Sequence, residues 1–246
     1  MSTAFTFPGQ GSQSVGMGKD LADSFSEARA VFDEVDAALG QNLSALMFDG
    51  PEDELTLTAN AQPALMAVSL AAMRALEARG FVLADRAACV AGHSLGEYSA
   101  LAAAGALTVA DTARLLRIRG NAMQDAVPVG QGAMAAIIGL EQHAVEAICS
   151  DCSTGGVCQI ANDNGGGQLV ISGSKQNVEK AAALASESGA KRALMLPVSA
   201  PFHSELMQPA ADAMRAALAD VQLKAPVVPL VANVQAEPVS DPDQIK

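Results

Sequence analysis

The chain has 246 residues, of which 50% are hydrophobic and 17% charged, a balance typical of a soluble globular protein with a sizeable core. Its formal net charge of −12 disfavours nucleic acid and anionic membranes as partners, and its 3% of aromatic residues offers few platforms for stacking bases. No apolar run reaches the roughly 18 residues that cross a bilayer, and residues 1–5 lack the basic start of a secretory signal. We therefore expect a cytoplasmic protein with reduced cysteines.

The first part of the chain alternates short strands with helices. Residues 4–7 predict a buried strand that runs into a turn at residues 8–11. Apolar side chains at a spacing of three or four residues then predict one long helix that ends at Gly40; they are Leu21, Phe25, Ala28, Phe32, Val35 and Leu39. A second helix is predicted from Pro63 to Gly80.

A strand, a sharp turn and a helix are predicted next. Residues 87–91 read as a small buried strand, and residues 97–104 as an alanine-rich helix. Thr108 and Asp111 have the spacing of a capping box, which predicts a further helix that runs to about Ala126.

The pattern changes after residue 126 to strand, helix, strand, strand, helix and strand, over residues 133–140, 141–150, 157–161, 168–172, 175–188 and 192–197. This βαββαβ order is that of a ferredoxin-like unit, so we expect a small domain over residues 127–198, inserted into a larger domain of residues 1–126 and 199–246.

The larger domain is predicted to resume with a helix over residues 209–220 and an apolar strand over residues 227–234. Residues 240–246 resemble a helix start, with Ser240 or Asp241 as the cap and a proline in the first turn. We therefore expect the larger domain to be truncated at its C-terminus.

The strongest functional signal is the sequence Gly-His-Ser-Leu-Gly at residues 92–96. It matches the G-x-S-x-G elbow of serine enzymes and lies between a predicted strand and a predicted helix. Such an elbow exposes the serine hydroxyl and directs the following N–H groups at an oxyanion. Ser94 is thus the candidate nucleophile, and a serine that only caps a buried helix is the alternative.

A serine nucleophile needs a base, and the chain has three histidines. His143 falls in a predicted surface helix, and His93 points to the other side of the turn. His203 lies in a proline-bounded segment where the chain returns from the insert, and we predict that it is the base. No aspartate between Ser94 and His203 is distinctive enough to be a third member of a triad.

Arg119 occupies an apolar face of its predicted helix, with Leu115, Leu116, Ala122, Met123 and Ala126, whereas Arg114, Arg117 and Gln124 fall on the opposite, solvated face. A guanidinium in this setting needs an anion, because an unpaired buried charge costs several kcal/mol. The sequence leaves two readings open, a carboxylate of the protein and a carboxylate of a ligand.

Two other patterns give weaker evidence of function. Residues 8–13 lack the third glycine and the lysine of nucleotide-binding loops, so their glycines are predicted instead to let backbone N–H groups approach Ser94 as a second oxyanion donor. Cys149, Cys152 and Cys158 lack a fourth ligand at zinc-site spacing, so we predict structural thiols and no metal.

Together these patterns resemble the bacterial malonyl-CoA:acyl carrier protein transacylase family. The resemblance spans the chain and rests on residues 7–13, 92–97, 119–120, 162–167 and 201–204. It implies an α/β hydrolase-like core with a ferredoxin-like insert and an active site in the cleft between them. It also implies an acyltransferase that moves a malonyl group from malonyl-CoA to the phosphopantetheine thiol of acyl carrier protein in fatty-acid synthesis, without a cofactor.

The resemblance also implies a role for individual residues. Ser94 is acylated with His203 as its base, and the N–H groups of Gln10 and Leu95 form the oxyanion hole. The remaining implied substrate contacts are Arg119, which clamps the malonyl carboxylate, Phe202, which crowds an added methyl group, and Asn162. A glutamine whose carbonyl orients the histidine is expected beyond Lys246.

The carrier protein of such a pathway is acidic, so we predict that Lys191 and Arg192, with Arg117 as a helper, form its docking patch on a monomeric enzyme. Ordinary solvated charges are the alternative for these residues. A serine esterase or thioesterase of similar core fold and a non-catalytic fragment that binds carrier protein remain alternative functions.

Overall fold

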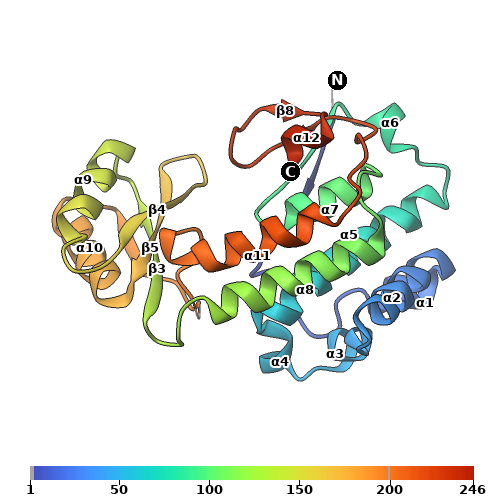
Figure 1. Cartoon of the computed structure of the whole chain (residues 1–246), viewed down its shortest axis with the longest axis horizontal. Coiled ribbons are helices and arrows are strands. Elements are labelled where there is room, and N and C mark those ends of the chain that lie inside the picture. The colour runs from blue at the N-terminus through green and yellow to red at the C-terminus, as the bar shows by residue number, and fades with distance from the viewer. Residues whose placement is uncertain (1–2, 199) are drawn as a thin grey trace. The chain divides into compact units, whose positions relative to one another are not determined.

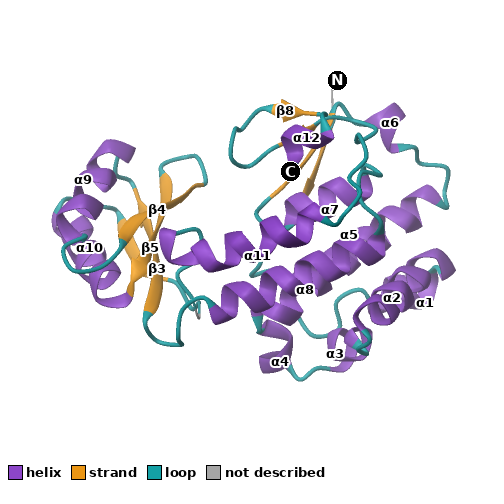
Figure 2. Cartoon of the chain, viewed as in Figure 1, coloured by secondary structure: helices purple, strands orange, loops and turns teal. Residues whose placement is uncertain are grey.

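The computed structural model describes residues 3–198 and 200–246 of the chain (Figure 1). These residues form two compact units, the first from the chain up to Asn121 and from Met214 onward, the second from Ala122 to Ala213. Both units combine strands with helices, as Figure 2 shows, so the chain is a mixed α/β protein. The predicted insert, residues 127–198, lies within the second unit, which starts before it and ends after it.

The first unit contains a four-stranded sheet in the order β1-β2-β7-β8. Its strands are β1 (Ala4–Phe7), β2 (Cys89–Gly92), β7 (Leu230–Val231) and β8 (Pro238–Val239). β1 and β7 run parallel to β2, so the carboxyl ends of these three strands lie at the same edge of the sheet, while β8 is antiparallel to β7. Phe7 pairs with Gly92, which places the turn after β1 beside the turn after β2.

The helices of the first unit pack on this sheet and on one another. They are α1 (Lys19–Ser24), α2 (Ser26–Leu39), α3 (Leu43–Asp49), α4 (Glu52–Thr56), α5 (Thr58–Glu77), α6 (Leu83–Arg86), α7 (Gly96–Ala103) and α12 (Pro242–Ile245), with parts of α8 (Val109–Asp125) and α11 (Gln208–Ala219). α7 packs against β1 and β2, and α5 packs against both α7 and α2. The core therefore holds α7, which follows the serine turn, from two sides.

Two predicted helix boundaries were wrong. The helix predicted over residues 21–39 is interrupted by an extended Phe25, so α1 and α2 are separate, although Gly40 ends α2 in a left-handed conformation as predicted. α5 begins at Thr58, so Pro63 lies inside it rather than at its start. Residues 61–67 are all buried, and their packing outweighs the backbone hydrogen bond that the proline removes.

The second unit contains an antiparallel sheet in the order β4-β5-β3-β6. Its elements follow in the order β3 (Gly132–Ile138), α9 (Gln142–Cys152), β4 (Cys158–Asp163), β5 (Gln168–Ser174), α10 (Lys175–Glu187), β6 (Arg192–Met195) and the 3₁₀ turn η1 (Glu205–Met207), so the predicted βαββαβ order is confirmed. Alternate residues of β3 face opposite sides. Ala135 and Ile137 pack in the cluster with α9 and α10, whereas Met134 packs with Phe202.

The C-terminal part of the first unit differs most from the sequence prediction. Of the strand predicted over residues 227–234, only Leu230–Val231 forms a strand, β7, because the chain then leaves the sheet and returns as β8. The Ala232 N–H donates to the Glu237 carbonyl at 3.1 Å, and the Ala236 N–H donates to the Ala232 carbonyl at 2.9 Å. The predicted helix start is confirmed, since Asp241 Oδ1 caps α12 by accepting from the Asp243 N–H at 2.9 Å.

Helix α8 begins at the predicted capping box. The Thr108 hydroxyl accepts from the Asp111 N–H at 3.0 Å and donates to the Asp111 carboxylate at 2.7 Å. Further along, Gly120 brings α8 close to the first turn of α5. A Cβ atom there would lie 2.6 Å from Ala59 Cα and 2.8 Å from the Thr58 carbonyl oxygen. Both neighbours are backbone atoms, so they cannot rotate away.

Replacing Gly120 with alanine tests this close approach. Helix propensity alone predicts that Gly120→Ala stabilises the protein by about 1 kcal/mol. We expect the opposite sign, a loss of about 1 kcal/mol or more, because the added methyl group separates the two helices. Urea unfolding measures the free energy, and a midpoint equal to or above that of the unchanged protein would contradict the packing argument.

Candidate active site

Ser94 lies in a tight turn between β2 and α7, as the sequence predicted. Its φ of 52° is in the left-handed region, which costs a residue other than glycine about 1–3 kcal/mol unless its surroundings compensate. Gly92 and Gly96 make the turn possible: a Cβ on Gly92 would lie 1.9 Å from the Gly96 carbonyl carbon, and one on Gly96 would lie 2.4 Å from the Phe7 carbonyl oxygen. Each glycine of the elbow is thus sterically required.

Asn233, which sequence reasoning placed inside a strand, binds this turn directly. Its side-chain oxygen accepts a hydrogen bond from the Ser94 N–H at 2.8 Å, and its side-chain nitrogen donates to the Gly92 carbonyl at 2.7 Å. Its own backbone N–H donates to Glu97 Oε2 at 3.3 Å. No sequence signal pointed to this role, because the strand predicted over residues 227–234 includes Asn233.

Arg119, on α8, is brought to the serine. Its Nη2 donates to Ser94 Oγ at 2.9 Å, and its Nη1 donates to the side-chain oxygen of Gln62 at 2.7 Å. Gln62 is 1% exposed and was missed at the sequence level, because it lies among apolar residues of α5. The sequence left two partners open for Arg119, a carboxylate of the protein and a carboxylate of a ligand. No aspartate or glutamate among the described residues forms an ion pair with it.

The electrostatic environment of Arg119 matches its place on an apolar helical face. Burial lowers the pKa of the guanidinium, and the neighbouring Tyr98 and Glu97 partly oppose this shift. The Tyr98 ring centroid lies 5.8 Å from the guanidinium carbon. Burial likewise raises the pKa of Glu97, against the hydrogen bond from Asn233 and the charge of Arg119. Glu97 and Arg119 are both partly buried, so solvent screens their charges less than it would at an exposed surface.

Gln10 follows β1 and lies on the turn that approaches the elbow. Its side-chain nitrogen donates to the Thr58 hydroxyl at 3.2 Å. The preceding Gly9 permits the close approach predicted for this turn, since a Cβ there would lie 2.5 Å from Nδ1 and 2.9 Å from the carbonyl oxygen of His93. Within the elbow, the His93 N–H donates to the Phe7 carbonyl at 3.0 Å, which ties the two turns together.

His203, Phe202 and Asn162 all belong to the second unit. His203 has a φ of 57°, a second residue other than glycine in the left-handed region. The Ser204 hydroxyl donates to the Pro201 carbonyl at 2.7 Å, which stabilises this turn, and Phe202 is buried in a cluster with Met134 and Val170. Asn162 is partly buried on β4, at an irregularity in its pairing with β5. His143, as predicted, is exposed on α9.

The predicted docking residues fall into two groups. Lys191 and Arg192 are exposed at the start of the edge strand β6, followed by the exposed Leu194 and Met195. Arg117, however, is not on a solvated face: its two terminal nitrogens donate to the side-chain oxygens of Asn60 and Gln41, because α5 and the segment before α3 flank α8 there.

Two further residues complete that helical face. Arg114 is exposed, as predicted, and it pairs with Asp111. Gln124 is partly buried, so the prediction of a solvated face holds only for the first turns of α8.

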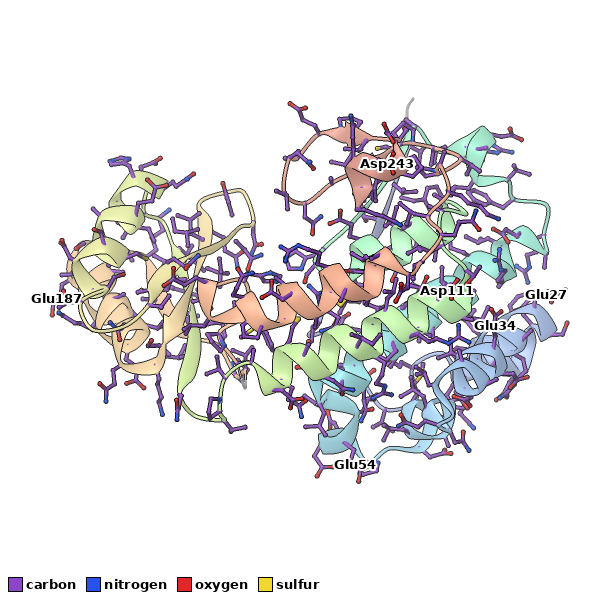
Figure 3. The ribbon with its side chains drawn as sticks, in the orientation of Figure 1. Glu27, Glu34, Glu54, Asp111, Glu187 and Asp243 are labelled. Carbon is purple, nitrogen blue, oxygen red and sulfur yellow. The ribbon has the colours of Figure 1, made fainter. Side chains whose placement is uncertain are left out.

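The acidic surplus of the sequence is visible on the surface. The side chains labelled in Figure 3 include the exposed Glu27, Glu34 and Glu54 of the first unit and the exposed Glu187 of the second.

The cysteines of the second unit are free thiols in its core. Cys149, Cys152 and Cys158 are buried, and the sulfur atoms of Cys149 and Cys158 lie 3.7 Å apart. Over residues 3–198 and 200–246, no group of three or more histidine, cysteine or acidic side chains is arranged to hold a metal ion. The same residues contain no helix with the length and hydrophobicity needed to traverse a lipid bilayer.

A family model and a curated relative that match this chain agree with each other. The model of the acyl transferase domain family matches residues 4–245. The malonyl CoA-acyl carrier protein transacylase of Bacillus subtilis (strain 168) is 48% identical over 99% of this chain and 76% of its own length.

Solved structures agree with this. The acyl-carrier-protein-S-malonyltransferase of Bartonella henselae matches with a TM-score of 0.97 and 63% identity over 100% of this chain and 78% of its own. A malonyl-transacylase in complex with its type II PKS acyl-carrier protein matches with a TM-score of 0.95 and 42% identity, over 100% of this chain and 78% of its own.

Proposed function

The chain belongs to the family of malonyl CoA-acyl carrier protein transacylases, and from that premise we propose that it transfers a malonyl group from malonyl-CoA to the phosphopantetheine thiol of acyl carrier protein in fatty-acid synthesis. The observation that carries the proposal is the contact between Arg119 and Ser94, at 2.9 Å. It joins a nucleophile to a cation that has only neutral hydrogen-bond acceptors in the described chain. A carboxylated acyl group offers a carbonyl carbon to Ser94 and a carboxylate to Arg119.

The reaction has two halves. Ser94 Oγ attacks the thioester carbonyl carbon of malonyl-CoA, its proton passes to His203, and the carbon–sulfur bond breaks as coenzyme A leaves and regains a proton. The thiol of the carrier protein then attacks the serine ester, and the carbon–oxygen bond to Ser94 breaks as the serine hydroxyl is restored. Neither half needs a metal or an organic cofactor.

The oxyanion that forms in each half requires hydrogen-bond donors. We assign these to the N–H groups of Leu95 and Gln10. The N–H groups of Gly96 and Glu97 donate to the carbonyls of His93 and Ser94, at 2.9 and 3.1 Å, so they are engaged in the start of α7. Leu95 directly precedes Gly96, the first residue of α7, at the end of the helix where its partial positive charge favours an anion.

Arg119 is the proposed clamp for the malonyl carboxylate. Its planar guanidinium can bind a carboxylate through two hydrogen bonds, and Gln62 holds one edge of it in place. Asn162 and Phe202 are the other proposed substrate contacts. The Phe202 ring would disfavour an added methyl group by about 1–3 kcal/mol, which gives partial selectivity for malonyl over methylmalonyl groups.

The proposed architecture is that of an α/β hydrolase-like core, residues 1–126 and 199–246, with a ferredoxin-like domain over residues 127–198. The parallel strands that lead into the Ser94 turn support the first part, and the antiparallel sheet of βαββαβ order supports the second. The free cysteines fit a reducing compartment, so we also propose that the reaction takes place in the cytoplasm.

The covalent intermediate provides the decisive test. We expect malonyl-CoA alone, without carrier protein, to add one malonyl group to the protein, and peptide mass spectrometry to locate it on Ser94. Ser94→Ala should abolish the adduct, whereas the control Ser150→Ala, an exposed serine on α9, should retain it. An unmodified Ser94, or an adduct that persists in Ser94→Ala, would overturn the proposal.

Removing the guanidinium tests the clamp. For Arg119→Ala we expect kcat/KM with malonyl-CoA to fall on the order of 100-fold, because a buried charged pair is lost, while the value with acetyl-CoA changes by less than about 3-fold. Arg114→Ala, on the exposed face of the same helix, is the control. An equal fall for both acyl groups would instead favour a serine esterase whose arginine is only structural.

Docking of the carrier protein is proposed at Lys191 and Arg192, where cations and apolar side chains are exposed together on β6. We expect the double change Lys191→Glu and Arg192→Glu to raise KM for an acidic carrier protein about 10-fold at low salt, and added salt to reduce the difference. The double change Lys175→Glu and Lys180→Glu, at two exposed lysines on α10, alters the net charge equally and is the matched control. An equal effect of this control would show that only net charge matters.

A further inference from the structure

Two segments that are far apart in the sequence meet at the Ser94 turn. Residues 92–97 form the turn and the start of α7, and Asn233, 139 positions after Ser94 in the chain, meets them from the hairpin between β7 and β8. One residue therefore contacts three points of the turn through its side-chain oxygen, its side-chain nitrogen and its backbone N–H.

These contacts fix the backbone on one side of Ser94. The Gly92 carbonyl belongs to the peptide group before His93, and the Ser94 N–H belongs to the peptide group after it, so the Asn233 amide holds both planes. On the other side, α7 holds the chain, because the Glu97 N–H donates to the Ser94 carbonyl at 3.1 Å. The φ torsion of Ser94 lies between these two restraints, and a left-handed value persists only where neighbours impose it.

The same contacts determine which amide can act as a donor. The Ser94 N–H is occupied by the Asn233 oxygen, and those of Gly96 and Glu97 are occupied by carbonyls of the turn. Among the amides of residues 94–97, the Leu95 N–H alone has no acceptor within the described residues. Asn233 thus directs an anion at the elbow toward Leu95 rather than toward the nucleophile's own amide.

The hairpin that carries Asn233 is itself fixed. The hydrogen bonds between Ala232 and Glu237 and between Ala236 and Ala232 close it, and Glu97 binds the Asn233 backbone. Asn233 is exposed, whereas Gly92, whose carbonyl it satisfies, is buried. Its position is therefore determined by these hydrogen bonds and by the pairing of β7 with β2.

We propose that Asn233 is a positioning residue of the acyl transfer, which holds Ser94 in its left-handed conformation and withdraws the Ser94 N–H from the oxyanion site. The inference rests on the proposed function of Ser94 as the nucleophile. It predicts an effect on the chemical step and not on the binding of malonyl-CoA, because Arg119 and Gln62 are bound to each other independently of Asn233.

The experiment compares three variants of the full chain in steady-state transfer of malonyl groups. Asn233→Ala removes both side-chain bonds and should lower kcat about 10- to 100-fold with KM for malonyl-CoA within about 2-fold. Asn233→Asp keeps an acceptor for the Ser94 N–H but loses the donor to Gly92. Its kcat should lie between that of Asn233→Ala and that of the unmodified protein. Asn177→Ala, which also removes an amide bonded to a backbone carbonyl, is the matched control and should leave kcat unchanged.

A second measurement separates this inference from the proposed function. Amide hydrogen exchange of the Ser94 N–H, followed by NMR, should accelerate at least about 10-fold in Asn233→Ala and much less in Asn233→Asp. Unchanged exchange and a kcat within 2-fold of the unmodified protein would overturn the role of Asn233, as would an equal rise in KM. If malonyl-CoA does not acylate the unmodified protein, the proposed function fails, and the exchange rates still decide whether Asn233 holds the turn. If Asn233→Ala does not fold, Asn233→Asp provides the comparison.

Discussion

The site depends on a backbone contact so close that it excludes every side chain. At the Ser94 turn, Gly92 and Gly96 face each other, and Gly96 also meets the end of β1, with distances from a hypothetical Cβ of 1.9 and 2.4 Å. This contact lets β2 reverse into α7 within a few residues and brings the turn after β1 beside the elbow. The hydroxyl of Ser94, the amide of Leu95 and the position of Gln10 all depend on it. A serine in a looser turn would lack these fixed neighbours.

The second constraint is the charge of Arg119, whose side chain is partly buried. A guanidinium in such a setting is usually neutralised by a carboxylate of the protein, because burial of an unpaired charge is costly. Here its hydrogen bonds go to Gln62 and Ser94, which are neutral, and Glu97, whose pKa is raised by its own burial, remains outside ion-pair contact. Polar but uncharged partners hold the guanidinium in position without satisfying its charge. Such an arrangement favours an anionic ligand and places it next to the Ser94 hydroxyl.

What the sequence could predict follows from the range of each interaction. The elbow was predictable because its strand, two glycines and helix are adjacent in the chain, and Arg119 was predictable because helical periodicity places it among apolar residues. The same periodicity failed for Arg117, since a single helix gives no information on the neighbours Asn60 and Gln41, which come from distant segments.

Asn233 could not have been predicted for the same reason. Its side chain meets the elbow only because β7 lies beside β2, and the apolar residues around it predict a longer strand than the hairpin allows. Long-range pairing thus determined what local pattern could not.

Backbone strain gives an independent view of the same residues. In the described part of the chain, the residues other than glycine with a left-handed φ are Ser94, His203 and Ala236. Such conformations persist only where surrounding structure compensates, and they concentrate where a protein needs a side chain in one orientation. Two of the three are the residues that the sequence predicted as nucleophile and base. The third lies in the hairpin that presents Asn233 to Ser94. Strain in that hairpin is consistent with a loop shaped to hold one amide against the elbow, rather than one that merely connects two short strands.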